Sequence, residues 1–148
     1  MAVKDTERFL MSETNEKVIR RFIDEVINNG DFSVLDQLVQ PNYVYRSPDQ
    51  QLDGPEALEE LLAAYRTAFP DMSVRIDDLV NGGDKVVISI TLTGTHEGDL
   101  MGISPTGRPV NIGGMILSRF QDGKIVEEYE ILDMLAMFQQ LGVVSLPA

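Results

Sequence analysis

The stretch that decides the fold runs from Met115 to Gly142 and reads MILSRFQDGKIVEEYEILDMLAMFQQLG. Within it, Asp122-Gly123 separates two runs rich in apolar residues. Asp-Gly in that setting predicts a β-hairpin, because both central residues of the tight turn need a positive φ. The stretch is therefore expected to form a strand, a turn, a second strand and then a short helix from Met134 to Leu141.

A carboxylate closes the second strand of this hairpin. Side chains alternate between the two faces of a strand. The residues expected to share one face are Ile125, Glu127, Tyr129, Ile131 and Asp133. Asp133 is then either the N-cap of the final helix, a position that Asp suits well, or a functional acid, and one residue can serve as both. The acidic run of Glu127, Glu128 and Glu130 is expected to be a solvated strand edge.

The rest of the chain falls into helices followed by strands. Residues 1–11 lack a clear period and are expected to be a flexible N-terminus, and residues 12–148 are expected to form one domain. Apolar residues recur at helical spacing in three segments and at strand spacing in three others. The predicted helices cover about 12–29, 33–39 and 55–69, and the predicted strands cover 73–80, 85–97 and 110–120, with a short extended piece at 43–46.

This order of elements predicts an α+β fold. About three N-terminal helices are expected to pack on one face of a strongly curved antiparallel sheet, and a short C-terminal helix follows. Gly113-Gly114 in the middle of a strand predicts a bulge or a sharp bend that would curve the sheet. Helices laid across such a sheet leave a conical pocket, which Tyr129, Ile131 and Asp133 are expected to face.

The composition excludes several classes of protein. The formal charge is −12 and the isoelectric point is about 4.3, which argues against nucleic acid and anionic membranes as partners. The chain has no cysteine, which excludes disulfides, thiol catalysis and Cys-ligated zinc, and its single histidine argues against a His-rich metal site. No run has the length of a signal peptide or a membrane span, so a soluble cytoplasmic protein is expected.

Several short segments carry a resemblance to a known family. In order, they read Asn29-Gly30-Asp31-Phe32, Ala68-Phe69-Pro70-Asp71, Gly82-Gly83-Asp84-Lys85-Val86, Thr93-Gly94-Thr95-His96-Glu97-Gly98, Pro105-Thr106-Gly107-Arg108, and Asp122-Gly123-Lys124-Ile125-Val126-Glu127 leading to Asp133 and Gln140-Leu141-Gly142. From about Val18 to Gly142 the chain resembles the SnoaL-like polyketide cyclase (ester cyclase) family, within the nuclear transport factor two-like cone folds. It departs from the family at Tyr129, where a Trp is expected, so the pocket shape and substrate do not carry over.

The resemblance implies a cone-shaped α+β barrel and a cyclase that needs no cofactor and no metal. Such an enzyme performs an intramolecular aldol condensation on a polyketide ester, or related acid/base chemistry on a small apolar carbonyl compound. The resemblance assigns the acid/base role to Asp133, which lies between the aromatic residue and the last helix. A carboxylate in an apolar pocket suits the removal of a proton from carbon, because desolvation raises its pKa.

Other residues are expected to support this chemistry or to line the pocket. His96 is either a donor to a developing oxyanion or a satisfied structural group. Arg119 either orients a carbonyl group or is exposed at the end of the hairpin. The expected pocket wall comprises Tyr45, Tyr65, Asn111, Met115, Arg119, Tyr129 and Ile131.

Two interpretations from other functional classes stay open. The same fold can be a non-catalytic small-ligand-binding domain in which Asp133 is only a cap, or a dimerisation module. A homodimer or higher homo-oligomer is expected, because the strand faces present more apolar surface than one layer of helices can bury. The residues expected at that interface are Val110, Ile112, Val126 and Leu132.

Overall fold

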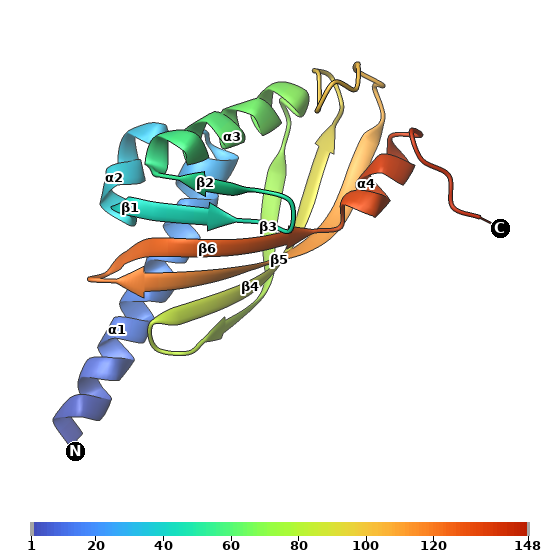
Figure 1. Ribbon diagram of the computed structural model, residues 1–148. Helices are drawn as coiled ribbons and strands as arrows, with labels where there is room; N and C mark the ends of the chain where they lie inside the picture. The colour runs from blue at the N-terminus through green and yellow to red at the C-terminus, as the bar shows by residue number, and fades with distance from the viewer. Residues whose placement is uncertain (1, 148) are drawn as a thin grey trace.

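A six-stranded sheet forms the centre of the computed structural model, which describes residues 2–147 (Figure 1). Its strands lie in the order β2-β1-β6-β5-β4-β3. They are β1 (Val39–Arg46), β2 (Gln51–Asp53), β3 (Ser73–Asn81), β4 (Lys85–Thr95), β5 (Pro109–Gln121) and β6 (Lys124–Leu132). All neighbouring pairs are antiparallel except β1 and β6, which are parallel. The α+β class is confirmed, and the expectation of a wholly antiparallel sheet is corrected at this one pair.

Helices precede, interrupt and follow the strands. They are α1 (Ala2–Arg21), the π-helical η1 (Phe22–Asn28), the 3₁₀ segment η2 (Phe32–Val34), α2 (Leu35–Leu38), α3 (Pro55–Ala68) and α4 (Met134–Gln140). The first helix begins at Ala2 rather than near Ser12, and its early part projects from the body of the protein (Figure 1). Residues 4–11 are exposed. This part of the helix therefore has no apolar face packed on the core, and the sequence lacks the helical spacing of apolar residues that would have predicted it.

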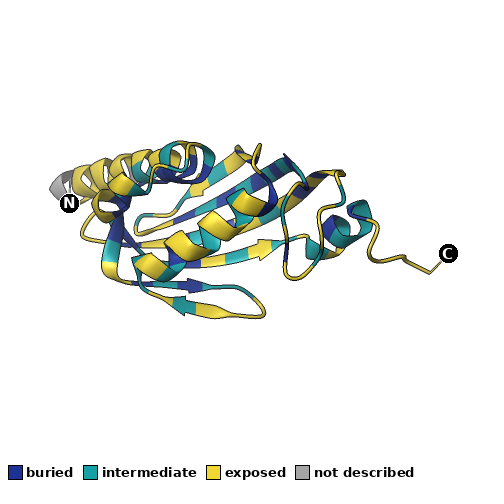
Figure 2. Ribbon diagram, turned by 90° about the horizontal axis from the view of Figure 1, so that it is seen from above, coloured by how far each residue is buried: buried dark blue, intermediate teal, exposed yellow. Residues whose placement is uncertain are grey.

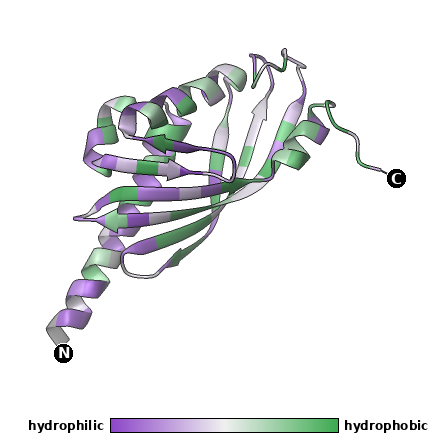
Figure 3. Ribbon diagram, in the orientation of Figure 1, coloured by the Kyte–Doolittle hydropathy of each residue, from purple (hydrophilic) through white to green (hydrophobic). Residues whose placement is uncertain are grey.

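The predicted hairpin is present between β5 and β6. Asp122 and Gly123 have φ angles of 52° and 78°, the left-handed values that a tight hairpin turn requires. The two strands pair antiparallel on either side of this turn. Both strands carry hydrophobic as well as hydrophilic residues (Figure 3).

A β-bulge in β6 reverses the faces that simple alternation predicts. Phe120 pairs with Ile125, but the preceding Arg119 pairs with Glu127, so Val126 is an extra residue in β6. Ile125 is buried before the bulge, and the inward-facing residues after it are Glu128, Glu130 and Leu132. This corrects the prediction for the other set, since Tyr129, Ile131 and Asp133 are exposed.

Gly113 and Gly114 of β5 do not form the predicted bulge. Pairing with β4 runs in continuous register through Gly113 and Gly114. A Cβ atom on Gly114 would lie 2.5 Å from Leu132 Cδ2 and 2.9 Å from the Ile131 carbonyl oxygen. Gly114 therefore permits the close approach of the end of β6, whereas the bulge lies in β6 itself.

The core lies between one face of the curved sheet and the helices α3 and η1 (Figures 1 and 2). In β4, Val86, Ile88, Ile90 and Leu92 are buried, as alternation predicted. From η1, Phe22, Ile23, Val26 and Ile27 are buried in the same cluster. Helix α3 begins at Pro55, a residue suited to the first helical position, and lies across the sheet. The space that these layers leave unfilled is the candidate site.

Candidate functional site

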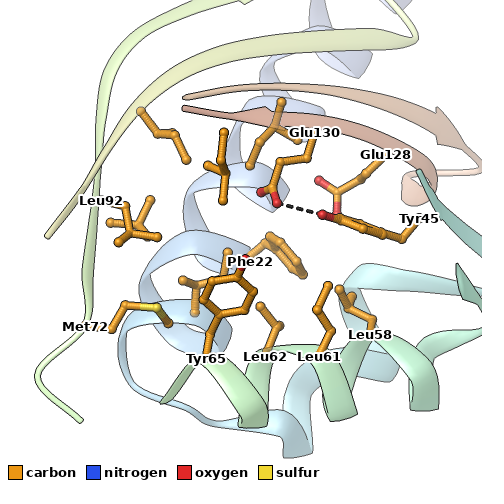
Figure 4. Close-up of a pocket in the computed structure, with 15 residues that line it drawn as sticks. Phe22, Tyr45, Leu58, Leu61, Leu62, Tyr65, Met72, Leu92, Glu128 and Glu130 are labelled. Atoms are coloured by element: carbon orange, nitrogen blue, oxygen red, sulfur yellow. Dashed lines mark hydrogen bonds between the residues drawn. The ribbon is translucent and has the colours of Figure 1, made fainter. Parts of the chain in front are cut away.

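A pocket lies between the concave face of the sheet and helix α3 (Figure 4). We call it the inner pocket, and its cavity volume is about 40 Å³. Two glutamates and two tyrosines interrupt a lining that is otherwise apolar. The lining residues are Phe22, Ile27, Tyr45, Leu58, Leu61, Leu62, Tyr65, Met72, Val74, Ile90, Leu92, Ile116, Glu128, Glu130 and Leu132.

A second hollow, which we call the mouth, adjoins the inner pocket. It is lined by Tyr45, Ser47, Pro48, Asp49, Gln50, Tyr65, Met101, Glu130, Leu132, Met134 and Phe138. Four residues line both spaces, and we call their position the junction: Tyr45, Tyr65, Glu130 and Leu132. A ligand in the mouth that reaches toward the inner pocket therefore meets these four side chains.

Glu130 lies at the junction and is held by a tyrosine from the neighbouring strand. The Tyr45 hydroxyl donates a hydrogen bond of 2.7 Å to Glu130 Oε1. The other carboxylate oxygen has no hydrogen-bond partner among the described residues. Burial raises the pKa of Glu130 above its ordinary value, against the opposing effect of the Tyr45 hydrogen bond. A carboxylate with a raised pKa and one free oxygen is suited to act as a general base or acid.

Glu128 lies two residues earlier on the same face of β6 and is only 3% exposed. The hydroxyl groups of Tyr43 and Ser118 each donate to one of its carboxylate oxygens, both at 2.8 Å. Burial raises the pKa of Glu128 to about 7, these two hydrogen bonds oppose the rise, and the charge of Glu130 adds to it. Because both oxygens are already bonded, Glu128 is less suited than Glu130 to contact a ligand.

Two tyrosines of β1 therefore donate hydrogen bonds to two glutamates of β6, Tyr43 to Glu128 and Tyr45 to Glu130. Burial raises the pKa of both Tyr43 and Tyr45, and the nearby glutamates raise it further, so both hydroxyl groups stay protonated donors. Glu128 and Glu130 were expected on a solvated strand edge, and their positions in the lining of the inner pocket correct this expectation. The spacing in the sequence could have indicated this arrangement. Tyr43 and Tyr45 are two residues apart, as are Glu128 and Glu130, so the members of each pair share one strand face.

Asp133 caps helix α4 and lies outside the inner pocket. Its Oδ1 atom accepts a hydrogen bond of 3.0 Å from the Ala136 N–H, and its side chain is exposed. The N-cap interpretation is therefore confirmed, and the predicted position in the pocket is corrected by the bulge at Val126. The catalytic role of Asp133 stays a prediction.

His96 is fully buried and lines neither the inner pocket nor the mouth. The Thr106 N–H donates to His96 Nδ1 at 3.1 Å, which leaves Nε2 to carry the proton in the neutral ring. Nε2 has no hydrogen-bond partner among the described residues. The ring packs against Phe69 with centroids 5.6 Å apart. The Nδ1 and Phe69 contacts hold the ring in place, but Nε2 is unsatisfied, so the expectation of a fully satisfied structural group is not met, and the role of oxyanion donor stays a prediction.

The structure brings two of the seven predicted wall residues to the pocket, Tyr45 and Tyr65. Met115, Tyr129 and Ile131 are 54%, 39% and 49% exposed on the opposite side of the sheet, which corrects their predicted placement in the wall. Asn111 and Arg119 are exposed as well, as the alternative for Arg119 foresaw.

The predicted interface residues also occupy other positions. Val110 and Ile112 are buried in the core, Leu132 lines the inner pocket, and Val126 is partly buried at the bulge. This corrects the surface expected for self-association. The exposed large apolar residues of β5, β6 and α4 are Met115, Tyr129, Ile131 and Leu135, and we call them the outer patch.

Carboxylates are the charged groups at the candidate site. The inner pocket and the mouth are lined by Glu128, Glu130 and Asp49 but by no Lys, Arg or His. Among residues 2–147, no group of three or more His, Cys, Asp or Glu side chains is placed to hold a metal ion. Within the same part of the chain, no helix combines the length and hydrophobicity needed to cross a membrane.

Comparison with known proteins relates this chain to a family. The chain matches the family model described as SnoaL-like polyketide cyclase over residues 17–141. It is 28% identical over 132 residues to the aklanonic acid methyl ester cyclase DauD of Streptomyces sp. (strain C5), covering 84% of this chain and 80% of that protein. It is 29% identical over 121 residues to the nogalonic acid methyl ester cyclase of Streptomyces nogalater, covering 78% of this chain and 88% of that protein. A crystal structure of a candidate SnoaL-like polyketide cyclase from Jannaschia sp. CCS1 has a similar fold, with a TM-score of 0.84, 24% identity, and 90% and 94% of the two chains covered.

Proposed function

This chain belongs to the SnoaL-like polyketide cyclase family, and from that premise we propose that it is an ester cyclase that works without a cofactor. Its reaction is an intramolecular aldol condensation on a small, mostly apolar polyketide ester, with Glu130 as general base and acid. The observation that carries the proposal is the position of Glu130, which lies at the junction and is bonded to Tyr45 through only one oxygen.

Glu130 can perform both proton transfers that the condensation needs. Its carboxylate takes a proton from a carbon between two carbonyl groups, and the electron pair of that C–H bond forms an enolate. The enolate carbon attacks a second carbonyl carbon of the same ligand, which forms the new C–C bond and an alkoxide. The alkoxide takes the proton back from Glu130, so no further reagent is consumed. A raised pKa suits a group that must both accept and return a proton near neutral pH.

The charges around the pocket favour an ester over a free acid. A ligand carboxylate at the junction would lie near Glu128, Glu130 and Asp49 in a poorly solvated space, with no Lys, Arg or His in the lining to compensate. An ester masks that charge. The two curated relatives described above are cyclases of methyl esters, which supports the same class of ligand for this chain.

Two residues compete with Glu130 for a role in the reaction. Asp133 stays a candidate base, because the resemblance to the family assigned it that role, and His96 stays a candidate donor to an oxyanion. Neither residue belongs to the lining of the inner pocket or of the mouth. Glu130 takes precedence for that reason.

The substitutions Glu130→Gln and Asp133→Asn decide between the two carboxylates. The assay is turnover of nogalonic acid methyl ester or aklanonic acid methyl ester by the purified protein. We expect Glu130→Gln to lower kcat by at least about a hundredfold, the usual size of a general-base contribution, and Asp133→Asn to keep wild-type activity. The reverse result would assign the base to Asp133. Binding of both esters by the wild-type protein without turnover would support the alternative of a non-catalytic ligand-binding domain.

The proposal includes a homodimer that associates through the outer patch. Isolated exposed apolar side chains are ordinary, but Met115 and Ile131 lie on adjacent paired positions of β5 and β6 and form one surface. A cytoplasmic location is also part of the proposal, supported by a sequence without cysteines, which has no disulfide to maintain in an oxidising compartment.

A further inference from the structure

The junction contains one hydroxyl group without an intramolecular partner. Apart from the two glutamates, Tyr45 and Tyr65 are the residues of the inner pocket whose side chains carry an O–H or N–H group. The Tyr45 hydroxyl is already bonded to Glu130. In the mouth, the Ser47 hydroxyl donates to Asp49. The Tyr65 hydroxyl has no hydrogen-bond partner among the described residues, so it is available to a ligand.

Helix α3 holds Tyr65 in a fixed position opposite Glu130. Leu58, Leu61, Leu62 and Tyr65 form one helical stripe that faces the pocket (Figure 4). The next residue, Arg66, donates from Nη1 to the carbonyl oxygens of Ile27 and Asn28, at 2.9 and 3.0 Å. These bonds tie the last turns of α3 to η1 and limit rotation of the helix. The donor is therefore preorganised before a ligand arrives, which is what electrostatic stabilisation of a transition state requires.

Tyr65 stays protonated across the physiological range. Burial raises the pKa of Tyr65 to about 12, and the negative charges of Glu130 and Asp49 contribute to the rise. Tyr65 and Glu130 both line the inner pocket and the mouth, so one ligand at the junction can contact both side chains. Tyr65 is thus a neutral hydrogen-bond donor that faces a general base across the junction.

We propose that Tyr65 is a catalytic hydrogen-bond donor, which bonds to the carbonyl oxygen that becomes negative when Glu130 removes a proton from the adjacent carbon. The proton passes from carbon to Glu130, the negative charge moves to the oxygen, and the Tyr65 O–H donates to that oxygen without giving up its proton. This assignment rests on the proposed function for the proton transfer, but the donor role itself does not require that the protein closes a ring.

The test uses 2-acetylnaphthalene, a neutral aromatic ketone whose carbonyl oxygen accepts hydrogen bonds but cannot donate them. In D₂O, exchange of its methyl protons for deuterium reports enolate formation and is followed by NMR. We expect Tyr65→Phe to slow protein-catalysed exchange about 10²- to 10³-fold, the usual effect of removing one oxyanion donor, with less than tenfold weaker ketone binding. Thr67→Val, which removes an exposed hydroxyl group from the same helix, should exchange at the wild-type rate.

Infrared spectroscopy of the bound ketone separates the donor role from the proposed function. The carbonyl stretch should shift to lower frequency on binding to the wild-type protein and to Glu130→Gln, and the shift should disappear in Tyr65→Phe. A carbonyl stretch that is equal in wild type and Tyr65→Phe would overturn the assignment of Tyr65. Exchange rates of wild type and Tyr65→Phe within threefold of each other would also overturn it, provided that wild type exchanges faster than Glu130→Gln. Loss of the shift in Tyr65→Phe, together with wild-type exchange no faster than that of Glu130→Gln, would uphold the donor and refute only the acid/base role of Glu130.

Discussion

The buried carboxyl group of Glu128 should make the stability of the fold depend on pH, and Glu128→Gln should remove that dependence. The side chain is 3% exposed, and burial raises its pKa from the ordinary value of 4.5 to about 7. Each unit of pKa difference between the folded and unfolded states is worth about 1.36 kcal/mol. The folded state therefore loses about 3 kcal/mol of stability relative to the unfolded state when this group ionises.

The sign follows from which state holds the proton. Below pH 4.5 the carboxyl group is protonated in both the folded and the unfolded chain, and the stabilisation is fully present. Between pH 4.5 and about 7 the unfolded chain releases the proton while the folded protein keeps it, so the free energy of unfolding falls as the pH rises. Above pH 7 both states are ionised, and the loss is complete.

The measurement is the free energy of unfolding in urea at pH 4.5 and at pH 8, for the wild-type protein and Glu128→Gln. Glutamine has nearly the same shape and no charge at either pH. The difference in stability between the two proteins should therefore move by about 3 kcal/mol in favour of the variant on going from pH 4.5 to pH 8. Glu127→Gln, which alters a partly exposed neighbour, should show little such change. Parallel pH profiles for wild type and Glu128→Gln would refute the burial argument.

Three further outcomes follow from the contacts described above. Asp133→Ala should lower the free energy of unfolding by about 1 kcal/mol through loss of the helix cap, whereas Asp133→Asn should leave it nearly unchanged in urea denaturation. Gly114→Ala should destabilise by about 1–3 kcal/mol, because its Cβ would lie 2.5 Å from Leu132 Cδ2; a melting temperature equal to that of the wild type would show that β6 can move aside. Ile131→Asp places a charge in the outer patch and should shift the mass measured by light scattering from dimer to monomer, while a monomeric wild type would contradict the proposed dimer.

The parts of the fold that could be predicted are those set by local pattern. The Asp122-Gly123 turn needs only its own two residues, and the stripe of α3 and the alternation of β4 extend over enough residues to be recognised. Tyr45 and Tyr65 were correctly expected at the pocket because regular alternation or helical spacing connects each to its neighbours. The parallel pairing of β1 with β6 joins segments far apart in the chain, and no local pattern encodes it.

Glu130 could not be predicted as the candidate acid, because nothing in the sequence identifies Val126 as the bulge residue that turns the Glu130 side chain toward the pocket. Val126 is apolar and follows the buried Ile125, so it reads as an ordinary strand residue, and only the pairing with β5 shows that it is extra. Asp133 was predicted as the acid because regular alternation placed it on the same face as Tyr129 and Ile131 and because the resemblance to the family assigned it the acid/base role. The glutamates were not, since acidic residues on a strand are usually solvated.

The bulge at Val126 is therefore the feature that connects the fold to the proposed chemistry. With regular alternation from Ile125, the inward set would be Glu127, Tyr129 and Ile131, and the Glu128 and Glu130 carboxylates would lie on the outer face in water. One extra residue instead turns both glutamates toward the tyrosines of β1, where burial raises their pKa and the hydroxyl groups fix their orientation. The same shift sends Tyr129 and Ile131 outward, where they supply apolar surface to the outer patch. A single insertion in one strand thus accounts for both the acidic pocket and the surface proposed for self-association.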